Sequence, residues 1–371
     1  MFILFCILII GIHLSPILFR SLDIWHAQGV WVQGMIAILL AWSFFEKPKY
    51  LIKKNIPLGL LFLWMSVNTG VICYLGQVNG YYDTAHFFPY FNFLCLLLLY
   101  RLITSHITFK QIEKILYILK YTVIFTLFVS TLQVFNLSQF FRIIDPTHSH
   151  HNNIVTGMLG NGTHLSGFLG MCAPLFFYKM KRIDKLSLVL LGLILLHTGT
   201  TIGDPSISGF IIVPLLFLYY YKDKFHVIWP ILAMGLFIAL WVYPNIPEQF
   251  FSFQGRPPLW KAYWPVYKLL PVTGAGLGTV GMVRKYVFPT ATHLHLEYFE
   301  IALDLGLIGL VLVFNCIYEF LRTTAKDKLQ LTLKTIVIGF LLSCSFNFPA
   351  HLWLPSTYAM IAYAGYMKRG S

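Results

Sequence analysis

The sequence predicts an all-α, polytopic integral membrane protein, and its composition is the first reason. Hydrophobic residues make up 57% of the 371 positions, charged residues only 11%, and the mean hydropathy is +0.71. An ordinary soluble domain carries about 25% charged residues. This chain therefore has too few polar side chains to cover a globule in water. Its apolar length suffices for about twelve transmembrane helices, because one spanning helix needs about 20 apolar residues.

The apolar runs, taken in chain order, define the expected helices. Gly203, Asp204 and Pro205 separate two short runs, so this pair could be a broken or re-entrant helix. The first run lacks a small-residue cleavage site, and we expect a helix there rather than a removed signal peptide. The runs lie at 1–19, 28–45, 56–77, 87–104, 117–135, 154–178, 186–200, 206–221, 227–243, 297–321, 330–348 and 352–367.

The distribution of basic residues predicts the orientation of the chain in the membrane. If the N-terminus lies in the cytoplasm, most of the 27 Lys and Arg residues fall in inside segments, among them Lys54, Lys181 and Lys326. Such a bias is the positive-inside pattern. We therefore expect both termini in the cytoplasm. We attribute the net charge of +13 to contacts with membrane lipids rather than with nucleic acid.

One connection is much longer than the others. We treat residues 1–371 as a single membrane domain in which 244–296 form a large polar, aromatic-rich loop on the outside face. Basic side chains in an outside loop violate the positive-inside bias, and a bound anion such as a diphosphate is the simplest reason, because Arg can grip two phosphate oxygens. Attraction to anionic lipid headgroups is the alternative. The basic and imidazole residues of this loop are Arg256, Lys261, Lys268, Arg284, Lys285, His293 and His295.

Several motifs follow one another through this loop. Arg256–Trp260 reads Arg-x-x-x-Trp, residues 271–278 read Pro-x-x-Gly-x-Gly-x-Gly, and His295 precedes the Gly-x-x-Gly of Gly306–Gly309 by eleven residues. The glycine string alone indicates a tight turn near the membrane, because it lacks the Lys-Ser/Thr ending of a phosphate loop. Together, the order resembles the O-antigen ligase/polymerase superfamily, whose pattern is His-[Asn/Ser/Gln], nine residues and Gly-x-x-Gly. Asp304 stands where that family often has an acidic residue.

The chain departs from the family pattern at three places. Leu296 follows His295, where the family has Asn, Ser or Gln. The arginine usual before the segment that resembles 157–161 is missing, and Arg142 is the nearest candidate. The Ser-Arg pair often found after the next helix is replaced in the region of Thr200 and Thr201.

The resemblance implies an enzyme activity and a location. It implies an inverting, metal-independent glycosyltransferase that moves a glycan from an undecaprenyl-diphosphate carrier to an acceptor hydroxyl at the periplasmic face of the bacterial cytoplasmic (inner) membrane. The preferred hypothesis is an O-antigen ligase, which attaches O-antigen to lipid A-core in lipopolysaccharide synthesis. A repeat-unit polymerase acting on a growing glycan is the close alternative.

Two other readings stay open. A transporter or flippase for lipid-linked sugar would show polar residues through the midplane of several helices and some internal symmetry. In this chain the charge on the outside face gathers in one loop instead, which favours chemistry at the membrane surface. A degenerate relative that binds lipid-linked glycan without turnover is the other possibility, because family arginines are missing.

The resemblance and the chemistry together suggest a general base. The attacking alcohol must lose a proton, and an imidazole that titrates near neutrality suits this task. His295 fits the family spacing, and His293 could do the same work in another register. Asp304 would orient a histidine or hold an arginine. Glu297 and Glu300 share its helix face, but carboxylates near a helix N-terminus have a sufficient explanation in the helix dipole.

Arginines would stabilise the leaving diphosphate. Arg256 is the first candidate, followed by Arg284 and Arg142. Lys261 and Lys268 are better explained as interfacial anchors, because Lys side chains reach for the headgroup layer.

No cofactor and no metal are expected from the sequence. The six cysteines are scattered singly through apolar runs, without metal-ligand or redox spacing. Residues 148–151 read His-Ser-His-His, but no nearby carboxylate or cysteine completes a spaced zinc site. A polar rim or a sugar-contacting surface is the preferred interpretation of this cluster.

Overall fold

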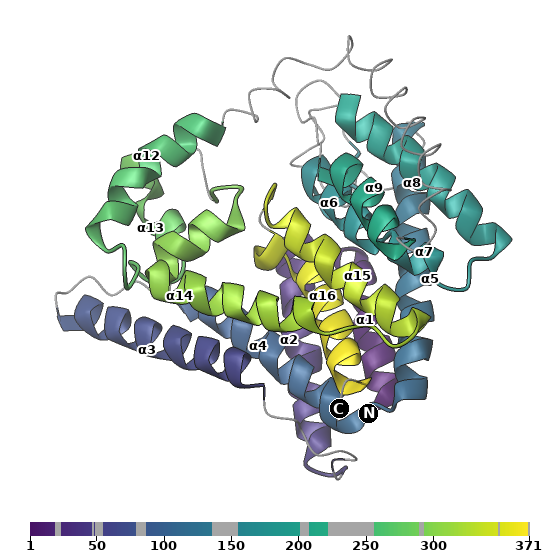
Figure 1. Cartoon of the computed structure of the whole chain (residues 1–371), viewed down its shortest axis with the longest axis horizontal. Coiled ribbons are helices and arrows are strands. Elements are labelled where there is room, and N and C mark those ends of the chain that lie inside the picture. The colour runs from purple at the N-terminus through teal and green to yellow at the C-terminus, as the bar shows by residue number, and fades with distance from the viewer. Residues whose placement is uncertain are drawn as a thin grey trace.

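The computed structural model describes residues 1–18, 24–46, 48, 55–78, 87–135, 155–200, 208–221, 256–288, 293–347 and 349–369. Within these ranges every regular element is a helix and no strand occurs (Figure 1). The all-α expectation is thereby confirmed for the described part of the chain. The helices of the first half are α1 (Phe2–Leu18), α2 (Ile24–Ser43), α3 (Ile56–Val78), α4 (Phe87–His106), α5 (Phe109–Val134), α6 (Gly162–Cys172) and α7 (Pro174–Phe177).

The second half of the chain continues the bundle and adds the helices of the large loop. α12 and α13 both arise from the predicted loop at 244–296, of which residues 244–255 lie outside the described ranges. The elements are α8 (Arg182–Thr200), α9 (Ser208–Tyr220), α12 (Arg256–Leu269), α13 (Thr279–Val287), α14 (Glu297–Arg322), α15 (Lys328–Ser343), the 3₁₀ turn η7 (Pro349–His351) and α16 (Trp353–Arg369).

Most predicted apolar runs correspond to these helices. Every run except 227–243, which lies outside the described residues, overlaps at least one helix. Among the described residues, five helices are long and apolar enough to cross a membrane, so a multi-spanning protein is supported while the count of about twelve is not confirmed. The five are Ile24–Ser43, Ile56–Leu75, Phe88–His106, Phe109–Val134 and Glu297–Arg322.

The expectation of one continuous helix over 154–178 is wrong. Residues 157–160 form turns, and α6 begins only after Asn161, whose side chain accepts hydrogen bonds from the backbone N–H groups of Thr163 and His164. α6 ends at Cys172 because Pro174 cannot donate the next helical hydrogen bond. Pro174 instead begins the short helix α7, in the first helical position that suits a proline.

The core lies where α16 packs between α15 and α4, beside α1, α2 and α5 (Figure 1). Hydrogen bonds between side chains offset the cost of burying some of its polar groups away from water. His13 of α1 lies 2.7 Å from the Tyr358 hydroxyl of α16, and its other ring nitrogen lies 3.1 Å from the hydroxyl of Thr126 in α5. These contacts join three helices at the centre of the bundle.

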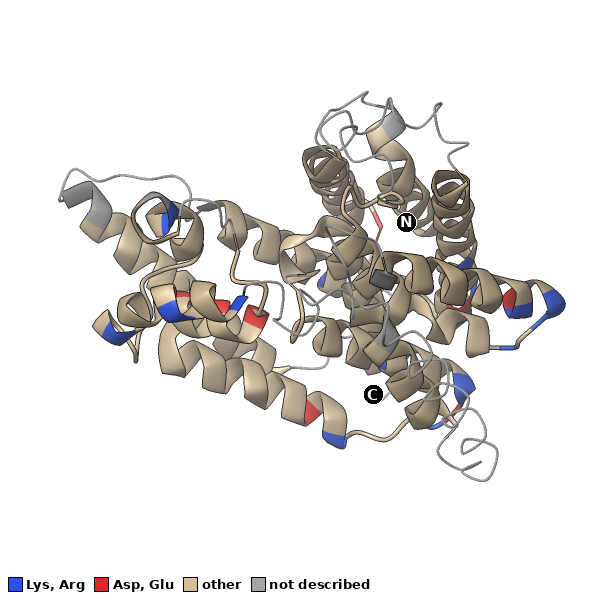
Figure 2. Ribbon diagram, turned by 90° about the horizontal axis from the view of Figure 1, so that it is seen from above, with Lys and Arg blue, Asp and Glu red and all other residues tan. Residues whose placement is uncertain are grey.

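α12 and α13 pack on the first turns of α14 and are set apart from the main bundle (Figure 1). Charged residues lie mainly at helix ends and on this side of the molecule, at the left of Figure 2. A small apolar core joins the three helices, and its buried members are Leu259, Tyr263, Val280, Leu294 and Leu303.

α14 is broken at Gly306, and the loop that precedes α13 repairs the break. Gly306 has φ 68° and ψ −170°, so helical hydrogen bonding is interrupted around it. The freed peptide groups of α14 pair with the glycine-rich loop 271–276, which is why the glycine string lies against the Gly-x-x-Gly motif. The bonds run from Ala275 N to Leu303 O (3.0 Å), Gly276 N to Asp304 O (2.9 Å), Leu307 N to Pro271 O (2.9 Å) and Ile308 N to Val272 O (3.2 Å).

Candidate active site

Three segments that are distant in the sequence meet at the start of α14. They are the first residue of α12, the turn 293–296 that leads into α14, and the connection 344–351 between α15 and α16. Arg256 opens α12 with its side chain buried, and its Nη1 donates to the carbonyl oxygen of Phe346 at 2.5 Å. The arginine of the large loop is thereby attached to the C-terminal connection.

Contacts on both sides fix the histidine turn. The backbone N–H of Leu294 donates to Glu300 Oε2 at 3.0 Å, and its carbonyl accepts from Trp260 Nε1 at 2.8 Å. His295 follows with φ 55°, in the left-handed region that few non-glycine residues adopt. Such backbone outliers persist where the surroundings hold them and cluster at functional sites. The conformation of His295 therefore supports a functional turn.

Leu296 occupies the N-cap position of α14 and makes no side-chain cap. The family residue types Asn and Ser are good N-caps, because their side chains accept a hydrogen bond from the first turn. In this chain the Glu297 N–H donates to the Cys344 carbonyl oxygen at 3.0 Å instead. The connection between α15 and α16 thus supplies the hydrogen-bond acceptor for this N–H group, which the apolar side chain of Leu296 cannot supply.

Glu297 and Glu300 form the buried floor of the site. Glu300 Oε1 lies 3.0 Å from His293 Nδ1 and 3.3 Å from His351 Nε2. Glu297 Oε2 also lies 3.3 Å from His351 Nε2, and its Oε1 accepts from the Ala350 N–H at 2.7 Å. The helix-dipole explanation of these two glutamates is therefore incomplete, because both carboxylates face imidazoles.

The local charges act differently on the imidazoles of His295 and His351. Burial, followed by the positive charge of Arg256, lowers the pKa of His295 to about 4, so this imidazole is neutral at pH 7. Burial also lowers the pKa of His351, but the carboxylates of Glu297 and Glu300 outweigh burial and raise it to about 10. A positive charge is thus favoured beside the two glutamates and disfavoured at His295.

Asp304 lies one turn deeper than Glu300, and its contacts differ from those expected. Its Oδ2 accepts from the Gly278 N–H at 2.8 Å and its Oδ1 from the Thr279 N–H at 3.2 Å. The carboxylate therefore binds the N-terminus of α13, which the helix dipole favours. Glu300, rather than Asp304, makes the direct contact to a histidine.

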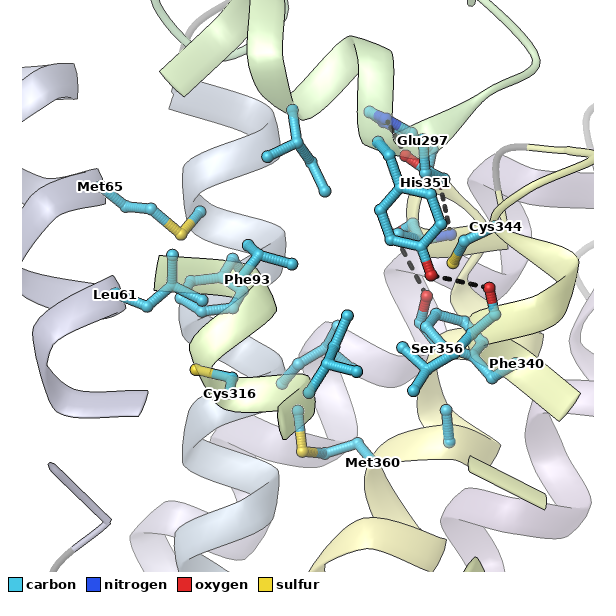
Figure 3. Close-up of a pocket in the computed structure, with 18 of the residues that line it drawn as sticks. Leu61, Met65, Phe93, Glu297, Cys316, Phe340, Cys344, His351, Ser356 and Met360 are labelled. Atoms are coloured by element: carbon cyan, nitrogen blue, oxygen red, sulfur yellow. Dashed lines mark hydrogen bonds and ion pairs between the residues drawn. The ribbon is translucent and has the colours of Figure 1, made fainter. Parts of the chain in front are cut away.

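A cavity of about 330 Å³ opens beside this cluster (Figure 3). Apolar side chains from α3, α4, α14, α15 and α16 form most of its wall, while Glu297 and His351 lie at one end. The cavity therefore combines a long apolar wall with a small polar end. Apolar members labelled in Figure 3 are Leu61, Met65, Phe93, Phe340 and Met360.

The structure brings together some of the predicted site residues. His293, His295 and Arg256 meet at the turn described above. Arg284 is half-buried on α13 and acts on Tyr263 of α12, where burial and the Glu300 charge raise the tyrosine pKa and the Arg284 charge opposes them. Arg142 and the histidines of 148–151 lie outside the described residues.

The sequence argument missed His351. A signal for it exists, because the gap between the apolar runs 330–348 and 352–367 falls on the same side of the membrane as the large loop when the spans alternate. His293, Glu300 and His351 each offer one donor atom, these atoms lie within 4.8 Å of one another, and the three residues could hold a metal ion.

A comparison with protein families tests the resemblance. The family model described as O-antigen ligase matches residues 186–314. This segment is similar to the O-antigen ligase domain. The match confirms the resemblance to the O-antigen ligase/polymerase superfamily, and the domain includes Arg256, Arg284 and the histidine turn, whereas His351 lies beyond it. No curated protein sequence matches the chain. Together with the apolar helices, the O-antigen ligase domain supports a membrane protein of a glycosyltransferase-like family.

Proposed function

We propose that this protein is a lipid-carrier-dependent glycosyltransferase of the bacterial cytoplasmic membrane. It moves a glycan from undecaprenyl diphosphate to an acceptor hydroxyl at the periplasmic face. The first form of the proposal is an O-antigen ligase that uses lipid A-core as acceptor. Both termini would lie in the cytoplasm. Inversion at the anomeric carbon, and the absence of a metal ion at the reacting atoms, are parts of this proposal that the family resemblance implies.

One observation carries the proposal most directly: the charge of the buried Arg256 acts on the neutral imidazole of His295, and the first turn of α14 that follows this histidine lines a cavity that is apolar along most of its wall. Arg256 supplies a planar, permanently charged group that suits a diphosphate. His295 supplies a proton acceptor that belongs to the family motif. The apolar wall suits part of a polyprenyl chain, because such a chain offers only apolar surface for contact.

In the proposed reaction, the acceptor hydroxyl attacks the anomeric carbon as the bond to the diphosphate oxygen breaks. His295 takes the hydroxyl proton, and the electron pair of the broken bond leaves on the diphosphate. Arg256 stabilises that charge, with Arg284 and Arg142 as further candidates for the same task. The carrier's phosphate ester supplies the driving force, so ATP is not consumed.

A repeat-unit polymerase is the alternative within the same chemistry, since a growing glycan can replace lipid A-core as acceptor. A flippase is the alternative from another class. Against a flippase, Glu297 and His351 lie together at one end of the cavity, and apolar side chains form most of the rest of its wall. A passage through the membrane would need polar groups along the route.

The direct test uses the purified protein in lipid nanodiscs with an undecaprenyl-diphosphate-linked glycan. Lipid A-core and a glycan repeat unit are supplied as acceptors in parallel reactions without ATP. Transfer to lipid A-core supports a ligase, and extension of the repeat unit supports a polymerase. Movement of the lipid-linked glycan between leaflets without any transfer product would contradict both and support a flippase.

A further inference from the structure

The cluster at His293 and His351 contains two buried carboxylates that face imidazoles, and an imidazole is a cation only when it is protonated. Glu297 and Glu300 are each about 2% exposed, and one oxygen of each faces the same nitrogen, His351 Nε2. That nitrogen carries at most one proton. Burying two carboxylates side by side is costly unless a cation lies between them.

The distances from His351 Nε2 to the two carboxylates also exceed those of ordinary charged hydrogen bonds, whereas His293 Nδ1 lies 3.0 Å from Glu300 Oε1. An imidazolium paired with a carboxylate usually lies about 2.7–2.9 Å from it. His351 Nε2 lies 3.3 Å from each of its two carboxylate oxygens. With zinc–nitrogen and zinc–oxygen bonds of about 2.0–2.2 Å, neighbouring ligand atoms of a tetrahedral site lie about 3.4 Å apart. The two distances from His351 Nε2 are closer to this ligand–ligand distance than to the length of a charged hydrogen bond.

We propose that the cluster of His293, Glu300 and His351 binds one divalent transition-metal ion. The ligand atoms are His293 Nδ1, His351 Nε2 and Glu300 Oε1, which lie within 4.8 Å of one another. Glu297 Oε2, 3.3 Å from His351 Nε2, adds negative charge beside these ligands. Imidazole and carboxylate together suit zinc and its neighbours in the first transition row.

The groups around the cluster orient the ligands as an outer shell does in metal sites. Each carboxylate uses its second oxygen to accept a backbone N–H, from Leu294 for Glu300 and from Ala350 for Glu297. The first oxygen of each is thereby turned toward the imidazoles. The His293 and His351 side chains are 24% and 22% exposed, so an ion can reach them from outside the fold.

The ion would join two parts of the chain that sequence alone keeps apart. His293 belongs to the turn that holds His295, and His351 belongs to the 3₁₀ turn after α15. A metal between them would clamp the histidine turn to the C-terminal connection. The sequence predicted no metal because these two imidazoles lie far apart along the chain. The ligand set does not include His295, the base of the proposed transfer reaction, and metal binding does not depend on that reaction.

The test measures metal binding without any substrate. The full chain, purified without a histidine tag in lipid nanodiscs, is stripped with a chelator and titrated with Zn²⁺. Bound zinc is then measured by elemental analysis. The expected result is about one Zn²⁺ per chain together with a rise in melting temperature. Binding no tighter than that of nanodiscs without protein would overturn the proposal.

Substitutions assign the site to these residues. His351→Ala and Glu300→Gln are expected to lower zinc affinity at least tenfold, since loss of an outer-shell partner alone costs about 10–100-fold. His26→Ala, at a histidine of α2 outside the cluster, is the matched control and is expected to bind as the unmodified chain does. Unchanged affinity in both cluster variants would overturn the assignment.

A measurement on the unmodified chain tests the site even if the variants fail to fold. Co²⁺ in a tetrahedral nitrogen and oxygen site gives visible d–d absorption bands, and Zn²⁺ should remove them by competition. Absence of these bands after Co²⁺ addition would contradict the site. Because none of these readouts involves glycan transfer, failure of the proposed enzyme activity would leave the result on metal binding intact, and the reverse also holds.

Discussion

Gly274 and Gly306 lie so close that neither position has room for a side chain. A Cβ atom on Gly274 would lie 2.4 Å from Gly306 N, and a Cβ atom on Gly306 would lie 2.5 Å from Gly274 N. Both residues have positive φ, 76° and 68°. The two glycine motifs of the sequence therefore meet as one structural junction, which fixes the loop before α13 against the broken turn of α14.

Gly306→Ala is expected to reduce the amount of folded protein. The new methyl group would meet the Val272 carbonyl oxygen at 2.2 Å, and the left-handed backbone alone costs an alanine on the order of 1 kcal/mol. Gly281→Ala is the matched control, because a Cβ there meets nothing within 4 Å. Yield and melting temperature after size-exclusion chromatography measure the effect. Equal stability of the two variants would show that the junction tolerates a side chain.

Arg256→Ala is expected to lower the rate of glycan transfer by roughly 10²–10³, the usual effect of removing one charge-stabilising partner. Arg256→Lys should recover only part of that loss, because an ammonium group cannot bind two phosphate oxygens in the planar geometry of a guanidinium. Lys268→Ala is the control: this exposed lysine lies in the last turn of α12, and its removal should matter little. Normal transfer by Arg256→Ala would shift the anion role to Arg284 or Arg142.

Asp304 can be tested for a role in positioning rather than in chemistry. Asp304→Ala removes both acceptors at the start of α13 and should destabilise the protein by about 1 kcal/mol per lost bond. Asp304→Asn keeps one acceptor oxygen, and we expect it to retain most of the stability and of the transfer rate. A stable Asp304→Asn variant without activity would instead assign the carboxylate to catalysis.

The sequence predicted the features that depend on composition and local pattern. The apolar runs predicted the helices because each run carries its own signal, and Pro174 is the exception at which a proline ends a helix inside a run. Motif spacing also led to the choice of Arg256 and the histidine turn as candidate site residues, and their roles stay predictions. The tight turn proposed for the glycine string also agrees with the structure.

Pairings between distant segments could not be predicted from one sequence. Nothing local to His351 indicates that it lies 3.3 Å from two carboxylates of α14. Likewise, the capping of Glu297 by the Cys344 carbonyl depends on how α15 packs, not on either residue's neighbours. A histidine or arginine side chain was the expected partner of Asp304, but its carboxylate accepts hydrogen bonds from the backbone at the start of α13.

The orientation of the chain in the membrane is a separate prediction. Single cysteines introduced at Lys181 and Lys326 in a cysteine-free background should be protected from a membrane-impermeant maleimide in intact cells. A cysteine at Lys268 should react. The physical reason is the concentration of basic residues in the inside segments. Protection of the Lys268 position would place α12 in the cytoplasm and remove the basis of a periplasmic reaction.

The identity of the base tests the central claim most directly. The measurement is the initial rate of glycan transfer from an undecaprenyl-diphosphate carrier by purified unmodified, His295→Ala and His293→Ala proteins in nanodiscs without ATP. The expected result is transfer by the unmodified chain and a loss of at least about 10²-fold in His295→Ala, with normal insertion and melting temperature. If only His293→Ala loses activity, the base lies in the other register. Normal rates in both variants, or a strict requirement for ATP, would contradict the proposed mechanism.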